Sequence, residues 1–67
     1  MKTALDLLDT APDSQVKRMQ IVFKSIAAGE WADAEFSLSN AARETEGQFS
    51  ADCIELALFC NDRGTAS

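Results

Sequence analysis

Residues 13–46, DSQVKRMQIVFKSIAAGEWADAEFSLSNAARETE, contain two helical patterns that are separated by one glycine, Gly29. In the first pattern, over residues 14–28, apolar residues recur every three or four positions and so share one side of a helix. These residues are Val16, Met19, Val22, Phe23 and Ile26. Asp13 or Ser14 is placed to cap the start of this helix, and Gly29 suits the left-handed conformation that ends one. The stretch therefore predicts a helix that stops at Gly29.

The second pattern, over residues 30–46, carries a narrow stripe of mostly small residues that includes Ala34 and Ala41. Small side chains let a neighbouring helix approach closely, and a short connection makes consecutive helices antiparallel neighbours. We therefore expect a helical hairpin in which Ala34 and Ala41 are buried against the first helix. The expected contacts are Met19, Phe23 and Ile26.

Helices are also expected on both sides of this hairpin. A short one over residues 3–9 contains three leucines and ends before Pro12. A longer one over residues 51–62 has Ser50 as its N-cap, with Phe49 and Ile54 at the two positions of a hydrophobic staple, and closes at Gly64. The prediction is a single all-α domain over residues 1–67: an antiparallel helical hairpin plus a third C-terminal helix, which together form a small three-helix bundle, with a short N-terminal helix.

The order Gly29-Glu30-Trp31-x-x-Ala34-x-x-x-Leu38-x-x-Ala41 resembles the turn and second helix of a tetratricopeptide repeat. Residues 13–46 also have the length of one such repeat, 34 residues. The resemblance covers a single unit. It implies protein or peptide binding without catalysis, and it does not imply a peptide-binding groove, because that groove needs neighbouring repeats.

The composition argues against several kinds of chemistry. The chain has no histidine and a net charge of −5, which excludes a Ser–His–Asp triad and disfavours direct binding to nucleic acid. The carboxylate pairs, among them Asp52 with Glu55, are expected on solvated helix faces. We expect no enzyme activity, no cofactor and no metal site. No apolar run approaches the ~18 residues of a membrane span, and we expect a cytoplasmic protein without membrane contact.

Two cysteines, Cys53 and Cys60, lie seven positions apart on the expected C-terminal helix. That spacing is about 10 Å along a helix axis, too far for a disulfide between them. Burial in the core is the favoured interpretation, since free cysteine is among the most buried residue types. A redox role or an intermolecular disulfide is the alternative.

Four apolar residues are candidates for a protein interface: Phe59, Leu56, Phe36 and Ile21. The apolar arc of the C-terminal helix covers more than half of its circumference, with Phe59 outside even that arc, so we expect a homodimer to cover it. Phe36 and Ile21 each lie outside the side of their own helix that is expected to pack in the hairpin. The alternative for these two is that Leu5 and Leu8 of the N-terminal segment cover one of them.

The charge is unevenly divided, with a net +1 in residues 1–29 and a net −6 in residues 30–67, which sum to −5. Such a division favours self-association, and the alternative is two solvated helix faces with ordinary salt bridges. The function expected is a small cytoplasmic protein–protein interaction module (an adaptor, cochaperone or subunit) that binds a protein partner through apolar helix faces. The alternative is a small acidic inhibitor, possibly from a mobile element, that blocks a nucleic-acid-binding protein by charge mimicry.

Overall fold

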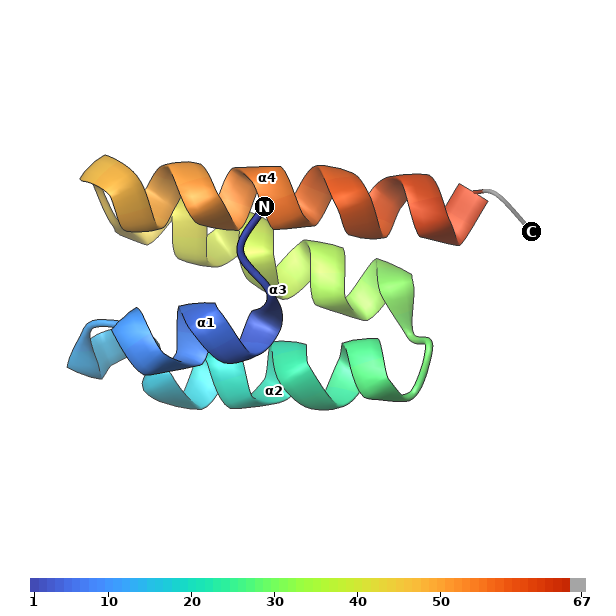
Figure 1. Ribbon diagram of the computed structural model, residues 1–67, viewed down its shortest axis with the longest axis horizontal. Coiled ribbons are helices and arrows are strands. Elements are labelled where there is room, and N and C mark those ends of the chain that lie inside the picture. The colour runs from blue at the N-terminus through green and yellow to red at the C-terminus, as the bar shows by residue number, and fades with distance from the viewer. Residues whose placement is uncertain (66–67) are drawn as a thin grey trace.

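The computed structural model describes residues 1–65, which form four α-helices and one 3-10 turn, without a β-strand. The elements are α1 (Ala4–Thr10), η1 (Asp13–Gln15), α2 (Val16–Ala27), α3 (Trp31–Glu44) and α4 (Gly47–Thr65). α3 packs against both α2 and α4, and α1 lies on α2 and also contacts α4 (Figure 1). The predicted all-α class is confirmed.

A reciprocal cap at Thr3 fixes the start of α1. The Thr3 backbone N–H donates to Asp6 Oδ2 over 3.0 Å, and the Asp6 N–H donates to Thr3 Oγ1 over 3.3 Å. Two donors that the helix itself cannot satisfy are thereby paired. The Thr3 backbone N–H and the Thr3 hydroxyl, which donates to Asp6 Oδ2 over 3.1 Å, lower the pKa of Asp6. Since Ala4 and Leu7 are buried, this short helix is held by packing as well as by its cap.

The turn between α2 and α3 is a Schellman motif at Gly29, whose φ is +74°. The Glu30 N–H donates to the Ser25 carbonyl over 2.8 Å, and the Gly29 N–H donates to the Ile26 carbonyl over 3.0 Å. Both bonds satisfy carbonyls at the end of α2. Only a residue without a Cβ adopts this φ at little cost, so the helix ends where the sequence predicted.

Ala34 and Ala41 are fully buried, as expected, but the expectation for Phe23 is wrong, because 44% of its surface is exposed. The buried side of α2 is set by Met19 and Val22, with Ser25 and the preceding Gln15. Phe23 lies to one side of this line of residues, outside the set that packs against the core. Ile26 is half-buried and packs against the core.

The segment that precedes α2 differs from the prediction. Residues 13–15 form a 3-10 turn, neither Asp13 nor Ser14 caps the α-helix, and α2 begins at Val16. Gln15 is buried, and its Oε1 accepts from Arg18 over 3.0 Å while its Nε2 donates to Glu44 over 3.4 Å. Because Arg18 also forms an ion pair with Glu44 at 3.1 Å, this cluster joins the start of α2 to the end of α3.

α4 begins four residues earlier than predicted, at Gly47, whose φ is +72°. Ser50 therefore lies inside the helix, and its hydroxyl donates to the Ala42 carbonyl at the end of α3 over 2.8 Å. The predicted cap at Ser50 is wrong, as is the staple, because Ile54 is half exposed. The Thr45 hydroxyl satisfies a second carbonyl at the end of α3, that of Ala41.

α4 also continues through Gly64 instead of ending there. A Cβ at Gly64 would lie 3.3 Å from the Cβ of Trp31. The absence of a side chain therefore lets the last turns of α4 pack closely against the first turn of α3. The core between the helices is dominated by these fully or almost fully buried residues: Leu7, Met19, Val22, Leu38, Cys53, Leu56 and Cys60.

Candidate functional site

The structure places one of the four predicted interface residues in the core and leaves a second partly covered. Leu56 is only 3% exposed and belongs to the core, so it cannot contact a partner in this conformation. Phe59 is partly buried, with its ring 6.3 Å from that of Trp31 in an edge-to-face arrangement. The Arg63 guanidinium lies 5.1 Å from the Phe59 ring. Contacts within the chain therefore cover part of the Phe59 ring, and its role in an interface stays a prediction.

Phe36 and Ile21 are on the surface, but on different helices. Phe36 on α3 is 69% exposed and Ile21 on α2 is 54% exposed. The alternative in which the N-terminal segment covers one of them is not observed. Leu5 is itself 54% exposed, and Leu8 packs against the core. The structure thus does not bring the four predicted residues together into one patch.

A groove follows the seam between α3 and α4. Its volume is about 280 Å³, and it is lined by Glu35, Ser39, Ala42 and Arg43 from α3 and by Ile54, Ala57 and Leu58 from α4. A second hollow of about 130 Å³ lies along the same two helices and shares Glu35 with the first. We call the larger groove together with Phe36 the α3/α4 face.

Two of the apolar residues on this face, Ile54 and Leu58, were missed as surface residues by the sequence analysis. They lie one helical turn apart and are 50% and 64% exposed. The sequence placed them inside the wide apolar arc of the C-terminal helix. In the structure the buried side of α4 is turned towards Phe59, which leaves Ile54 and Leu58 outside. Their spacing was visible in the sequence, but the direction of the core was not.

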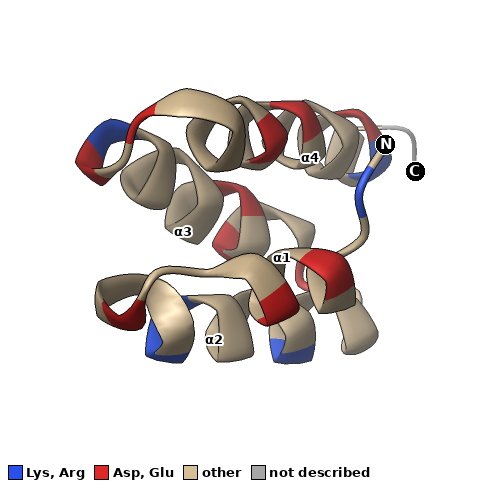
Figure 2. Cartoon of the chain, turned by 60° about the vertical axis from the view of Figure 1, so that its left-hand side comes forward, with Lys and Arg blue, Asp and Glu red and all other residues tan. Residues whose placement is uncertain are grey.

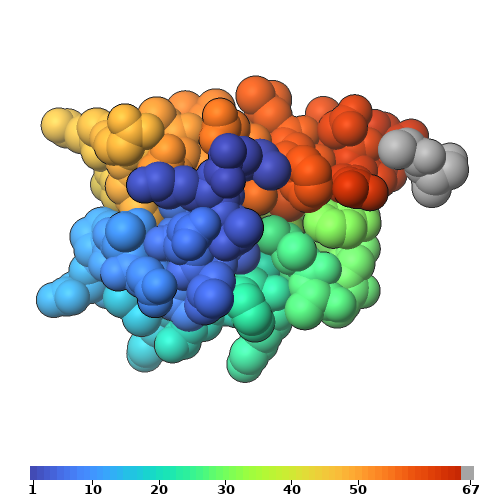
Figure 3. Space-filling model, viewed as in Figure 1, coloured from blue at the N-terminus to red at the C-terminus, as the bar shows by residue number. Residues whose placement is uncertain are grey.

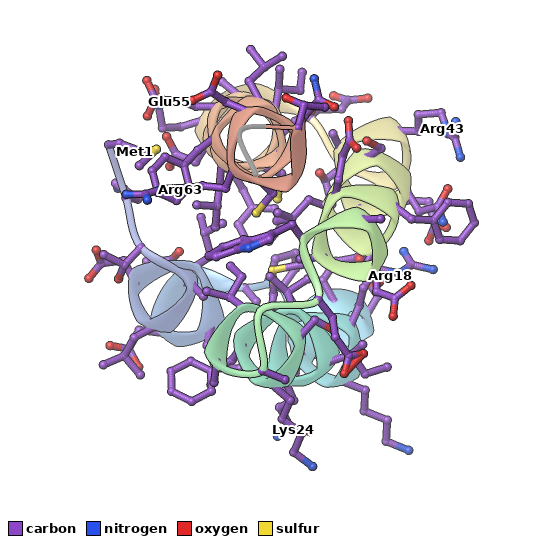
Figure 4. The ribbon with its side chains drawn as sticks, turned by 90° about the vertical axis from the view of Figure 1, so that its right-hand side faces the viewer. Met1, Arg18, Lys24, Arg43, Glu55 and Arg63 are labelled. Atoms are coloured by element: carbon purple, nitrogen blue, oxygen red, sulfur yellow. The ribbon has the colours of Figure 1, made fainter. Side chains whose placement is uncertain are left out.

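Basic and acidic residues are unevenly distributed among the four helices (Figure 2). Basic residues lie along α2, and acidic residues lie on α1, α3 and α4. The groove itself is lined by one carboxylate, Glu35, and one guanidinium, Arg43. Seen along the bundle, Arg43 lies on the opposite side of the molecule from Met1 and Arg63 (Figure 4). The groove is therefore locally balanced in charge although the chain carries −5.

The N-terminal residues lie against α4 on the face seen in Figure 3. Lys2 Nζ is 3.6 Å from Asp52 Oδ2, and Gln48 Nε2 donates to Asp52 Oδ1 over 2.8 Å. Asp52 is consequently buried, with 8% of its surface exposed. The expectation that Asp52 lies on a solvated face is wrong, because Lys2 and Gln48 supply the charge and the hydrogen bond that a buried carboxylate requires.

Both cysteines are free and fully buried, which confirms the core interpretation. Burial raises the pKa of the Cys53 thiol to about 11, with a smaller contribution from the charge of Asp52. Burial also raises the pKa of Cys60, with a contribution from Glu35. At neutral pH both side chains are therefore protonated thiols, which are poor nucleophiles.

Residues 1–65 contain no cluster of three or more cysteine, aspartate or glutamate side chains placed to hold a metal ion. Every helix in this part of the chain is too short or too polar to cross a lipid bilayer. No protein-family model, curated protein sequence or solved structure matches the chain. The similarity to a tetratricopeptide repeat thus stays a prediction.

Proposed function

We propose that this chain is a small protein-interaction module that binds another polypeptide through its α3/α4 face. In this proposal α2 and α3 act as a hairpin that supports α4. The observation that carries the proposal is the exposure of Phe36, Ile54 and Leu58 beside a groove between two helices. Burying one such side chain completely is worth about 1.5–3 kcal/mol. A polypeptide that covered all three would therefore gain several kcal/mol from apolar contact alone.

The shape of the α3/α4 face favours a polypeptide over a small molecule as its ligand. Small-molecule sites usually enclose about 300–1,000 Å³ and bury most of their ligand. The groove, at about 280 Å³, is smaller, and its apolar residues project into solvent along two neighbouring helices. Helical partners are commonly bound in this way, with apolar residues spaced one turn apart.

Charge mimicry is a second candidate, and one observation favours it. Four carboxylates on α1 and α4 are exposed: Asp6, Asp9, Glu55 and Asp62. Two others, Asp52 and Glu44, are already engaged by Lys2 and Arg18. Competition with duplex DNA for a basic target would support this candidate. A partner bound through Leu58 without such competition would support the first.

Site-specific photo-crosslinking tests the main proposal. A benzophenone amino acid at position 58 should form adducts with a protein in the native host, whereas the same group in place of Lys24 on α2 should not. The adduct is identified by mass spectrometry, and its binding to the purified chain is then measured by calorimetry. Leu58→Asp should weaken binding at least tenfold, and Lys24→Glu should leave it unchanged. If no adduct forms at position 58, or if Leu58→Asp has no effect, the proposal is wrong.

A further inference from the structure

The arrangement of charge on the α3/α4 face is self-complementary. Glu35 and Arg43 both line the groove from α3, two turns apart, which is about 12 Å along the axis. Ser39 lies midway between them and also lines the groove. Neither Glu35 nor Arg43 forms an ion pair within residues 1–65, and Arg43 donates to Asn40 of its own helix. The face therefore presents one unpaired charge of each sign, equally spaced about a central residue.

We infer that the polypeptide bound by the α3/α4 face is a second copy of this chain, an inference that rests on the function proposed above. A two-fold interface uses the same patch on both copies, so each group must meet its complement on an identical surface. When two α3 helices lie antiparallel with Ser39 on the two-fold axis, Glu35 of each copy lies opposite Arg43 of the other. Two ion pairs form across the interface from one pair of residues.

The apolar residues are arranged about the same centre. Phe36 lies three positions from Ser39 on α3 and is 69% exposed, so it flanks the two-fold axis. Leu58 lines the groove together with Ser39. The exposed apolar side chains of Phe36 and Leu58 therefore lie beside the residue through which the two-fold axis passes.

The surface of the chain limits the strength of this dimer. A standard interface takes about 800 Å² from each partner, which is about a fifth of the 4218 Å² that this chain exposes. The α3/α4 face must therefore be used along most of its length. We expect a reversible dimer with a Kd on the order of 1–100 µM.

Sedimentation equilibrium on purified protein, from about 5 to about 300 µM, tests the inference. The wild-type mass should rise with concentration from 7.3 kDa towards twice that value. Phe36→Asp, Glu35→Arg and Arg43→Glu should each weaken association at least tenfold. Circular dichroism should show that these surface variants remain folded. The matched controls, Glu55→Arg and Lys24→Glu, change the same charges elsewhere on the surface and should leave association unchanged (Figure 4).

The decisive sample is an equimolar mixture of Glu35→Arg and Arg43→Glu. Each variant alone places like charges opposite one another. In the mixed dimer the introduced arginine of one copy faces the introduced glutamate of the other, and the native Glu35 and Arg43 face each other at the second position. A heterodimer should therefore form with at least ten times the affinity of either variant alone. The double variant Glu35→Arg/Arg43→Glu should dimerise within about threefold of wild type, since it only exchanges the two charges.

A wild-type chain that stays monomeric throughout the concentration range overturns the inference, as does a mixture that does not associate. Neither result overturns the proposed function. That proposal is wrong only if no adduct forms at position 58 or if Leu58→Asp leaves binding unchanged. An adduct of twice the mass of the chain at position 58 would support both. An adduct with a different protein, together with a monomeric chain, would support the proposed function alone.

Discussion

Replacing Ala41 with leucine should destabilise the chain, because the packing of α3 leaves no room for a larger side chain. Ala41 is fully buried, as are Ala34 and Leu38 on the same side of α3. Leucine adds three carbon atoms at a point where another helix is in contact. Overpacking of this kind costs about 1–3 kcal/mol. For a domain of this size each 1 kcal/mol lowers Tm by about 4–8 °C, so Tm should fall by between about 4 and about 24 °C.

Urea unfolding followed by circular dichroism measures this loss directly. The midpoint should fall while the m-value stays unchanged, because the surface exposed on unfolding is nearly the same. Ala27→Leu is the matched control: Ala27 is exposed at the end of α2, and its substitution should change stability by less than about 0.5 kcal/mol. If Ala41→Leu unfolds at the wild-type midpoint, Ala41 does not face a close helix contact and the packing described for α3 is wrong.

Three further predictions concern cysteine, a salt bridge and a glycine. An aromatic disulfide reagent should react slowly with Cys53 at pH 8 until urea unfolds the chain, and fast reaction of the folded protein would contradict the burial. Because the folded chain holds the Cys53 thiol proton more tightly than the unfolded chain does, the free energy of unfolding should also fall as pH rises from 9.0 towards about 11. Glu44→Gln should lower Tm more at pH 7 than at pH 3, because hydrogen bonds from Arg18 keep the pKa of Glu44 below 4.5 and this stabilisation is lost as pH falls. Equal differences in Tm at both pH values would refute this reasoning, with Glu46→Gln as the control. Gly47→Ala should cost about 1–2 kcal/mol in urea unfolding, because φ is +72° there; an unchanged midpoint would show that this φ is not required.

The helical segments could be predicted from the sequence because the signals that define them are local. The periodic apolar residues of α2, and Gly29 after them, act within one turn of each other and need no distant contact. The start of α4 could not be predicted in the same way. Gly47 can end one helix or begin the next, and the choice depends on the hydroxyls of Thr45 and Ser50, which satisfy the carbonyls of α3 from outside it.

The interface residues were harder to predict, because the orientation of α4 about its own axis is a property of the whole fold. A helix that is apolar over more than half of its circumference has no single inward direction in the sequence. The direction is set by Trp31 and Arg63, which cover Phe59, and by the close contact between Gly64 and Trp31. Leu58 is left outside as a result. Phe36 falls outside the narrow apolar stripe of its own helix in the sequence, and the structure leaves it exposed.

The contact of α1 with α4 has a consequence for biosynthesis. α1 is translated before α2, α3 and α4, yet part of its packing surface, and the carboxylate that pairs with Lys2, belong to α4. The residues that bury Leu7 in the folded chain are therefore not all present while the chain is being translated. An isolated helix of seven residues is unstable in water, so α1 should become ordered only after α4 is released. Nascent chains halted before Gly47 should accordingly present α1 to proteases and chaperones as an unstructured segment.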